Sequence, residues 1–172
     1  MKDSLFIVLP ADQVEVGVVR KNIEKEDMDK ISVSDLSIGD WVRVRMCKCD
    51  YDDPDTLDAK VLSIVGNSVG IGYDECGICM SAFVDDLRPI PITAEVLKKN
   101  GWPEFSDYHN SWKLDIASDK QVWMFKNSHD WTFQVMSWGL GHNHSVAKAY
   151  IKYIHELQHA LRLAKVGKEI VL

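Results

Sequence analysis

The chain has 172 residues, enough for one large domain or two small ones. Its 46% hydrophobic and 27% charged residues are the balance of a soluble globular protein, and the net charge of −6 argues against a general binder of nucleic acid or anionic membranes. No apolar run approaches the ~20 residues of a membrane-spanning helix. The run Leu5 to Leu9 is too short for a signal-peptide core, so we expect a cytoplasmic protein.

The first half of the chain predicts short strands. Residues 1–30 form an N-terminal extension with predicted strands at 5–9 and 14–18. The run Leu36-Ser37-Ile38-Gly39-Asp40-Trp41-Val42 predicts a turn into a strand and is typical of small SH3-like barrels. Further strands are predicted at 60–65, 69–73 and 81–84, with a turn at Gly66-Asn67. We therefore predict a small SH3-like β-barrel over residues 31–92.

The second half, residues 93–172, begins after an extended linker. Two prolines between Asp86 and Ile92 forbid a helix there. Thr93 is a suitable N-cap for a short helix from Ala94 to Asn100. Alternating apolar residues then predict an antiparallel three-strand meander at 112–116, 122–125 and 131–135.

The segment from Ser145 to Val166 has the strongest helical pattern in the chain. Its apolar residues recur in steps of three and four, Ser145 is a suitable N-cap, and Gly167 is expected to end the helix. We expect this long C-terminal helix to cover the meander. The predicted fold class is thus α+β, with a small SH3-like barrel followed by an antiparallel sheet under a long helix.

That predicted helix contains the motif His155-Glu156-Leu157-Gln158-His159. H-E-x-x-H on a helix places two imidazoles one turn apart, so His155 and His159 are candidate zinc ligands and Glu156 a candidate general base. A third ligand would have to come from Glu169 or, upstream, from His142 or His144.

The surroundings of the motif favour a different interpretation. The apolar stripe of the predicted helix centres near Ile154 and Leu157, so both histidines are expected on the opposite, solvated face. Lys148 and Lys152 share that face, and their positive charge would oppose a bound dication. The alternative to a catalytic zinc is therefore a solvated helix face with two ordinary histidines.

Four cysteines form a second candidate metal site. Cys47-Lys48-Cys49 and Cys76-Gly77-Ile78-Cys79 give a C-x-C and C-x-x-C pair, and four thiolates on two turns can hold a structural zinc. A redox or disulfide pair is one alternative, and four reduced cysteines packed as small apolar side chains is the other.

Several stretches together resemble a known family. They are Leu36-Ser37-Ile38-Gly39-Asp40-Trp41-Val42, Asp86-Leu87-Arg88-Pro89-Ile90-Pro91-Ile92-Thr93, Leu97-Lys98-Lys99-Asn100-Gly101-Trp102 and Tyr153-Ile154-His155-Glu156-Leu157-Gln158-His159-Ala160-Leu161. In that order they resemble short, uncharacterised proteins of gut bacteria of the Bacteroidales type and of their phages and prophages. The resemblance covers Ile31 to Leu172, and Met1 to Asp27 departs from it. It implies a phage or mobile-element setting and no particular activity.

The sequence contains no Gly-rich phosphate loop, nucleophile elbow or paired-acid motif. We therefore expect a non-enzymatic protein-interaction or structural module. Its partner would be another protein or a second copy, with no membrane partner and nucleic acid disfavoured. We expect the six tryptophans to pack in the core and sheets rather than to form an aromatic binding platform. No cofactor is favoured; the alternatives are a zinc-dependent hydrolase using the histidine motif and a four-cysteine structural zinc module.

Overall fold

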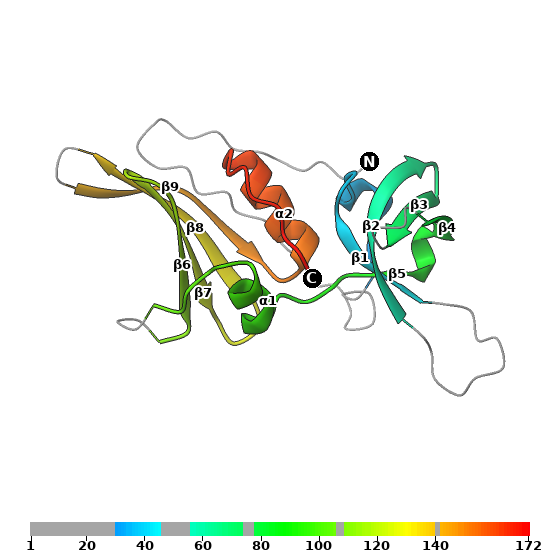
Figure 1. The fold of residues 1–172 in the computed structure, drawn as a ribbon, viewed down its shortest axis with the longest axis horizontal. Helices are drawn as coiled ribbons and strands as arrows, with labels where there is room; N and C mark the ends of the chain where they lie inside the picture. Colours follow the sequence, from blue (N-terminus) through cyan, green and yellow to red (C-terminus); the bar gives the residue numbers. More distant parts are fainter. Residues whose placement is uncertain (1–29, 46–55, 74–77, 106–108, 140–141) are drawn as a thin grey trace. The chain divides into compact units, whose positions relative to one another are not determined.

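The computed structural model describes residues 30–45, 56–73, 78–105, 109–139 and 142–172 (Figure 1). These residues form two compact units, each built on one antiparallel sheet. The five-stranded unit comprises the described residues up to Pro91, together with Tyr153–Gln158 and Leu172. The four-stranded unit comprises Ile92–Lys152 and His159–Val171. The chain therefore passes through each unit more than once.

The sheet of the five-stranded unit has the order β4-β3-β2-β1-β5, with every neighbouring pair antiparallel. Its elements are η2 (Val33–Asp35), β1 (Trp41–Arg45), β2 (Thr56–Val65), β3 (Ser68–Tyr73), β4 (Ile78–Phe83), η3 (Val84–Asp86) and β5 (Leu87–Arg88). Gly66, with φ +58°, forms the turn between β2 and β3, a conformation that glycine adopts at little cost.

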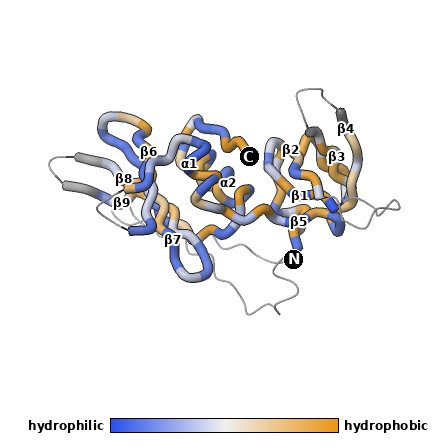
Figure 2. Tube along the Cα trace, turned by 60° about the horizontal axis from the view of Figure 1, so that its bottom comes forward, coloured by the Kyte–Doolittle hydropathy of each residue, from blue (hydrophilic) through white to orange (hydrophobic). Residues whose placement is uncertain are grey.

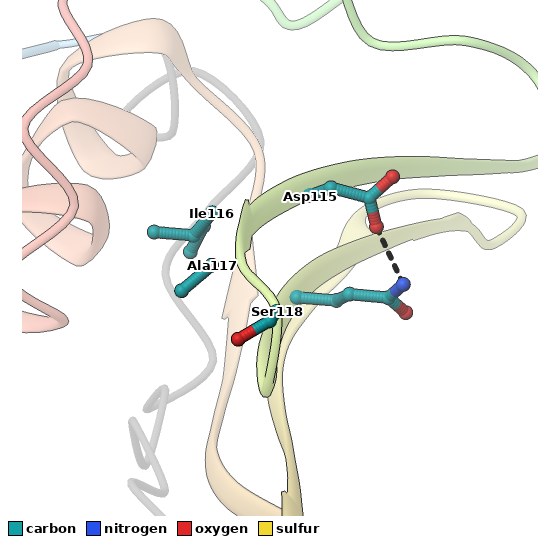
Figure 3. Close-up of a pocket in the computed structure, with 5 residues that line it drawn as sticks. Asp115, Ile116, Ala117 and Ser118 are labelled. Atoms are coloured by element: carbon teal, nitrogen blue, oxygen red, sulfur yellow. Dashed lines mark hydrogen bonds between the residues drawn. The ribbon is translucent and has the colours of Figure 1, made fainter.

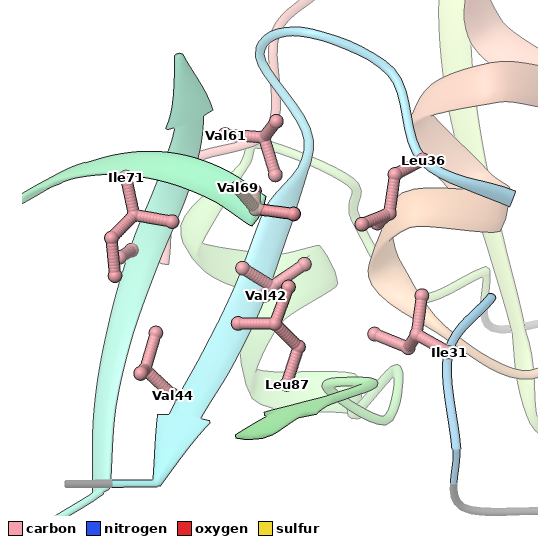
Figure 4. Packing of buried hydrophobic residues seen from close by; sticks show 9 residues of the cluster. Ile31, Leu36, Val42, Val44, Val61, Val69, Ile71 and Leu87 are labelled. Atoms are coloured by element: carbon pink, nitrogen blue, oxygen red, sulfur yellow. The ribbon is translucent and has the colours of Figure 1, made fainter. Parts of the chain in front are cut away.

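Alternation along these strands builds a core on one face of the sheet. Val42 and Val44 of β1 are buried, while Trp41, Arg43 and Arg45 point to the other face. Nine buried residues make up this core, and Figure 4 shows them converging from the strands and from the segment before β1: Ile31, Leu36, Val42, Val44, Ala59, Val61, Val69, Ile71 and Leu87. Figure 2 shows the hydrophobic residues of β2 and β3 in orange within this sheet.

The predicted SH3-like barrel is wrong, because the sheet is open. Among the described residues, β4 and β5 occupy opposite ends of the sheet and do not pair with each other. Alternation and turn residues are the same in an open sheet and in a barrel, whereas closure requires the two edge strands to pair, which depends on strand tilt and register rather than on local pattern. Here β5 spans only Leu87–Arg88, which leaves little strand to close a barrel.

The four-stranded unit has strand order β6-β7-β8-β9. Its elements are α1 (Ala94–Lys99), β6 (Ser111–Ala117), β7 (Lys120–Lys126), β8 (Trp131–Gly139) and β9 (His142–Ile151). The predicted three-strand meander is confirmed as β6, β7 and β8. The N-cap of α1 is also confirmed, since the Val96 amide donates to Thr93 Oγ1 at 3.3 Å.

The predicted long C-terminal helix is wrong in its first half. Ser145 to Ile151 lie in β9, and the helix α2 spans only Ile154–Leu163. Ala149 and Ile151 of β9 stand opposite Phe133 and Trp131 of β8, so the segment is held by a neighbouring strand. That tertiary pairing overrides the helix propensity of its alanines and lysine.

The end of α2 also differs from the prediction. The helix closes with Lys165 at φ +54°, where the Lys165 amide donates to Arg162 O and the Val166 amide to Leu161 O. This is a Schellman motif, and Lys165 occupies the left-handed position that glycine usually fills. Gly167, the predicted stop, lies two residues beyond it. No helix in the described parts of the chain is both long enough and apolar enough to cross a membrane.

Candidate functional site

The histidine motif lies at the start of α2, and its first histidine is buried. His155 is 5% exposed and its ring stacks on Tyr153, with centroids 5.9 Å apart and planes 7° from parallel. The prediction that His155 lies on a solvated face is therefore wrong. The buried residues of α2 form a wide stripe that includes His155 as well as the apolar residues: Ile154, His155, Leu157, Gln158 and Leu161.

Glu156 and Gln158 bind backbone groups. The Glu156 carboxylate accepts from the Tyr153 amide at 3.1 Å, which satisfies a donor at the helix start. Gln158 is 6% exposed; its Oε1 accepts from the Trp41 amide and its Nε2 donates to Gly39 O, both at 2.9 Å. One side-chain amide thus holds the turn that leads into β1. The sequence signal that was missed is a polar residue placed between apolar neighbours on the buried side of a helix.

The predicted metal sites stay predictions. Within the described ranges, no group of three or more His, Cys, Asp or Glu residues is placed to hold a metal ion. His159 is half-buried and belongs to the four-stranded unit, whereas His155 and Glu156 belong to the five-stranded unit. Of the cysteines, Cys47, Cys49 and Cys76 lie outside the described residues, as does the side chain of Cys79, so the four-cysteine site is not described. The predicted strands at 5–9 and 14–18 also lie outside.

A shallow depression of about 390 Å³ lies at the hairpin between β6 and β7 (Figure 3). It is lined by Asp115, Ile116, Ala117, Ser118 and Gln121. The Gln121 amide donates to the Asp115 carboxylate, and Gln121 Oε1 accepts from the Trp123 indole at 3.2 Å. Its amide and carboxylate groups therefore bind one another, and the depression is open rather than enclosed, unlike a typical small-molecule site.

Aromatic rings gather on the face of the four-stranded sheet opposite its core. Trp123 stacks on Phe125 at 5.7 Å and meets Phe105 edge-on at 5.0 Å, while the Lys113 ammonium lies 5.3 Å from the Phe105 ring centroid. The rings of this cluster are therefore in contact with one another and with the Lys113 ammonium. Three other tryptophans, Trp102, Trp112 and Trp131, are buried at 0%, 5% and 4% exposure, which confirms core packing for them.

The outer face of the five-stranded sheet, opposite its core, differs between its two ends. Near β1, charges are paired: Arg43 donates to both Asp58 oxygens at 2.7 and 2.9 Å. The hydrogen bond to Asp58 raises the pKa of Arg43 above its ordinary value. Lys60 lies over the Trp41 ring at 5.3 Å. This end of the face is therefore occupied by internal contacts.

The other end of that face exposes large hydrophobic side chains. Val65 is 75% exposed, Phe83 67% and Leu62 43%. Val65 stands opposite Ser68, and Ser68 opposite Phe83, so all three side chains lie on one face. Leu62, at the irregularity in β2, lies over Gly72, where an added Cβ would come within 2.5 Å of it. Neighbouring exposed hydrophobic residues of this kind mark interaction surfaces.

β4 forms the edge of the sheet beside Phe83. Within the described part of the chain it pairs with β3 only, and its sequence Ile78-Cys79-Met80-Ser81-Ala82-Phe83 contains no charge and no proline. Natural edge strands usually carry such residues to prevent pairing with another chain. The other edges are blunted: β6 carries Lys113 and Asp115, β9 carries Lys148 and pairs irregularly with β8, and β5 is two residues long. We call β4 with Val65 and Phe83 the β4 surface.

No protein-family model, curated protein or solved structure matches this chain.

Proposed function

We propose that the protein is a non-enzymatic interaction module that binds an extended segment of another polypeptide at the β4 surface. The observation that carries this proposal is an uncharged, proline-free edge strand that ends in the exposed Phe83, with the exposed Val65 on the same face two strands further in. An extended segment would add a strand to the sheet through backbone hydrogen bonds, and its side chains on the outer face would meet Phe83 of the neighbouring strand β4.

The expected affinity is modest. Covering one exposed valine or phenylalanine contributes at most about 1.5–3 kcal/mol, and each new backbone hydrogen bond about 0.5–1.5 kcal/mol. Loss of translational and rotational freedom and ordering of the segment oppose these gains. A complex of this size is expected to form and dissociate readily rather than to be permanent.

The test is a selection of random twelve-residue peptides displayed on a carrier, using the full chain as bait. Phe83→Lys places a charge on the β4 surface, and Leu163→Lys, at a residue 77% exposed near the end of α2, is the matched control. We expect selected peptides to bind the unmodified protein and Leu163→Lys equally and to lose at least tenfold in affinity for Phe83→Lys. Peptides that bind Phe83→Lys equally well would contradict the proposal, as would a selection that enriches none.

We further propose that the setting is a phage or mobile element of gut bacteria. The support is the resemblance of the four stretches beginning at Leu36, Asp86, Leu97 and Tyr153. Peptides from such bacteria and their phages are therefore the first natural sequences to place in the display library.

A further inference from the structure

We infer that the segment bound at the β4 surface carries basic residues at the end that meets Asp85 and Asp86, and that it is therefore a strand from a different protein rather than a second copy of this chain. This inference rests on the proposed function and names the class of partner.

An acidic pair follows β4 directly. The strand ends at Phe83, and the 3₁₀ turn η3 then presents Asp85 and Asp86, both exposed. The nearest basic side chain in the sequence, Arg88, donates to the main-chain carbonyls of Asp85 and Leu87 at 2.6 and 2.8 Å. Within the described residues, no ion pair joins either carboxylate to a basic side chain. Both are available to a ligand that continues past Phe83.

The distribution of charge along β4 and the turn after it indicates which kind of segment binds. Along β4 there is no charge, so the part of the segment that pairs with it needs only extended backbone and apolar or small side chains. Past the strand, two carboxylates favour a lysine or an arginine and oppose an acidic residue. In an antiparallel arrangement this basic residue lies near the N-terminal end of the segment, and in a parallel one near its C-terminal end.

The same pattern opposes self-pairing. β4 is followed by Asp85-Asp86 and is preceded in the sequence by Asp74-Glu75. An antiparallel pair of two β4 strands brings the start of one to the end of the other, and a parallel pair brings the ends together. In a parallel pair the two Asp85-Asp86 carboxylate pairs meet and repel one another, and for an antiparallel pair the sequence before β4, residues 74–77, supplies no basic residue to meet them.

The probes are fluorescein-labelled octapeptides with alternating valine and threonine. Two carry a pair of lysines at one terminus or the other, and two carry glutamates there instead. At low salt we expect the better lysine peptide to bind the full chain at least tenfold more tightly than its glutamate counterpart. The difference should shrink toward 0.5 M salt, because screening weakens exposed charge pairs. The double variant Asp85→Asn, Asp86→Asn should reduce the difference in affinity between the lysine and glutamate peptides to threefold or less. Asp119→Asn, in the exposed turn between β6 and β7, should leave this difference unchanged.

The outcomes separate the inference from the proposed function. Binding that Phe83→Lys abolishes, but that the double asparagine variant leaves unchanged, overturns the inference and keeps the function. Sedimentation experiments can also overturn the inference and keep the function. They would do so by showing a concentration-dependent dimer that Phe83→Lys dissociates, because the partner is then a second copy. Equal binding of the lysine peptides to Phe83→Lys, or no binding of any peptide at millimolar concentration, overturns both.

Discussion

At the scale of single residues, polar side chains of the histidine motif hold backbone in place. Glu156 caps the start of α2, and Gln158 binds the turn before β1 with both ends of its amide. The sequence drew attention to His155 and His159, because metal ligands have a known spacing. Gln158 stands among the apolar residues of the helix, which marks it as unusual, but the sequence could not give its partners. Gly39 and the Trp41 amide lie more than a hundred residues away and are backbone groups that no side-chain pattern reveals.

Replacing Gln158 with alanine should therefore destabilise the protein. It removes two hydrogen bonds and leaves the Trp41 amide and Gly39 carbonyl without them, an expected loss of about 2 kcal/mol. Gln158→Glu should cost at least as much, because a carboxylate cannot donate to the Gly39 carbonyl. Urea unfolding measures both, with Gln134→Ala on β8 as the control. Similar midpoints for Gln158→Ala and Gln134→Ala would show that the two bonds contribute little.

Thr93 provides a second residue-scale test at the start of α1. Its hydroxyl accepts from the Val96 amide, so Thr93→Ala should cost about 1 kcal/mol. A backbone hydrogen bond and the Thr93 hydroxyl hold the pKa of Glu95 below its ordinary 4.5. A carboxyl whose pKa is lower in the folded state than in the unfolded state stabilises the folded protein at pH values above its unfolded pKa. For Glu95 this stabilisation is therefore lost below pH 4.5, as the pH falls through the pKa of the folded state. In NMR titrations the Glu95 pKa should rise toward 4.5 in Thr93→Ala; an unchanged value would contradict the role of the hydroxyl.

At the scale of elements, strand positions followed from sequence where alternation and turn residues agreed, as around Gly66 and in β6 to β8. The region 145–151 was misassigned because its valine, alanines and tyrosine fit a helical stripe as well as they fit a half-buried strand. The deciding contact is pairing with β8, which a local pattern does not contain. The β4 surface was missed for a related reason, since edge position depends on strand order.

The end of α2 offers a substitution that should stabilise the protein. Lys165 adopts φ +54°, which costs a side chain roughly 1 kcal/mol relative to glycine. Lys165→Gly should raise the free energy of unfolding by up to about 1 kcal/mol, measured by urea or thermal unfolding. Gly167→Ala is the matched control, because no atom lies within 4 Å of an added Cβ and its φ is not positive. A loss of stability in Lys165→Gly would show that the lysine side chain contributes more than the strain costs.

At the scale of the whole molecule, the main feature is that the two units are interleaved along the chain. The linker that the prolines predicted ends near Pro91, yet the five-stranded unit also contains Tyr153–Gln158. Those residues supply the Ile154 amide that donates to Ile90 O, the bridge between Pro91 and Tyr153, and the Gln158 amide. Sequence patterns are local, so they could place the linker but could not show that the chain returns to the first unit.

A fragment that ends at Pro91 should consequently be less stable than the same region in the full chain. It lacks the Gln158 bonds and the buried Ile154 and Leu157 side chains. We expect circular dichroism of residues 1–91 to show no cooperative unfolding, or a midpoint well below that of the full chain carrying Gln158→Ala. A fragment that unfolds cooperatively with the midpoint of the full chain would show that Tyr153–Gln158 is dispensable.

The interleaving of the units also bears on how such a protein can change over evolutionary time. Tyr153–Gln158 belongs to one unit and its neighbours on both sides to the other. A single recombination event near Pro91 would give a descendant one sheet without the helical turn that anchors β1, and would leave that turn attached to a foreign partner. Gene shuffling is therefore expected to pass both sheets on together, so that relatives should carry the pair rather than either half alone.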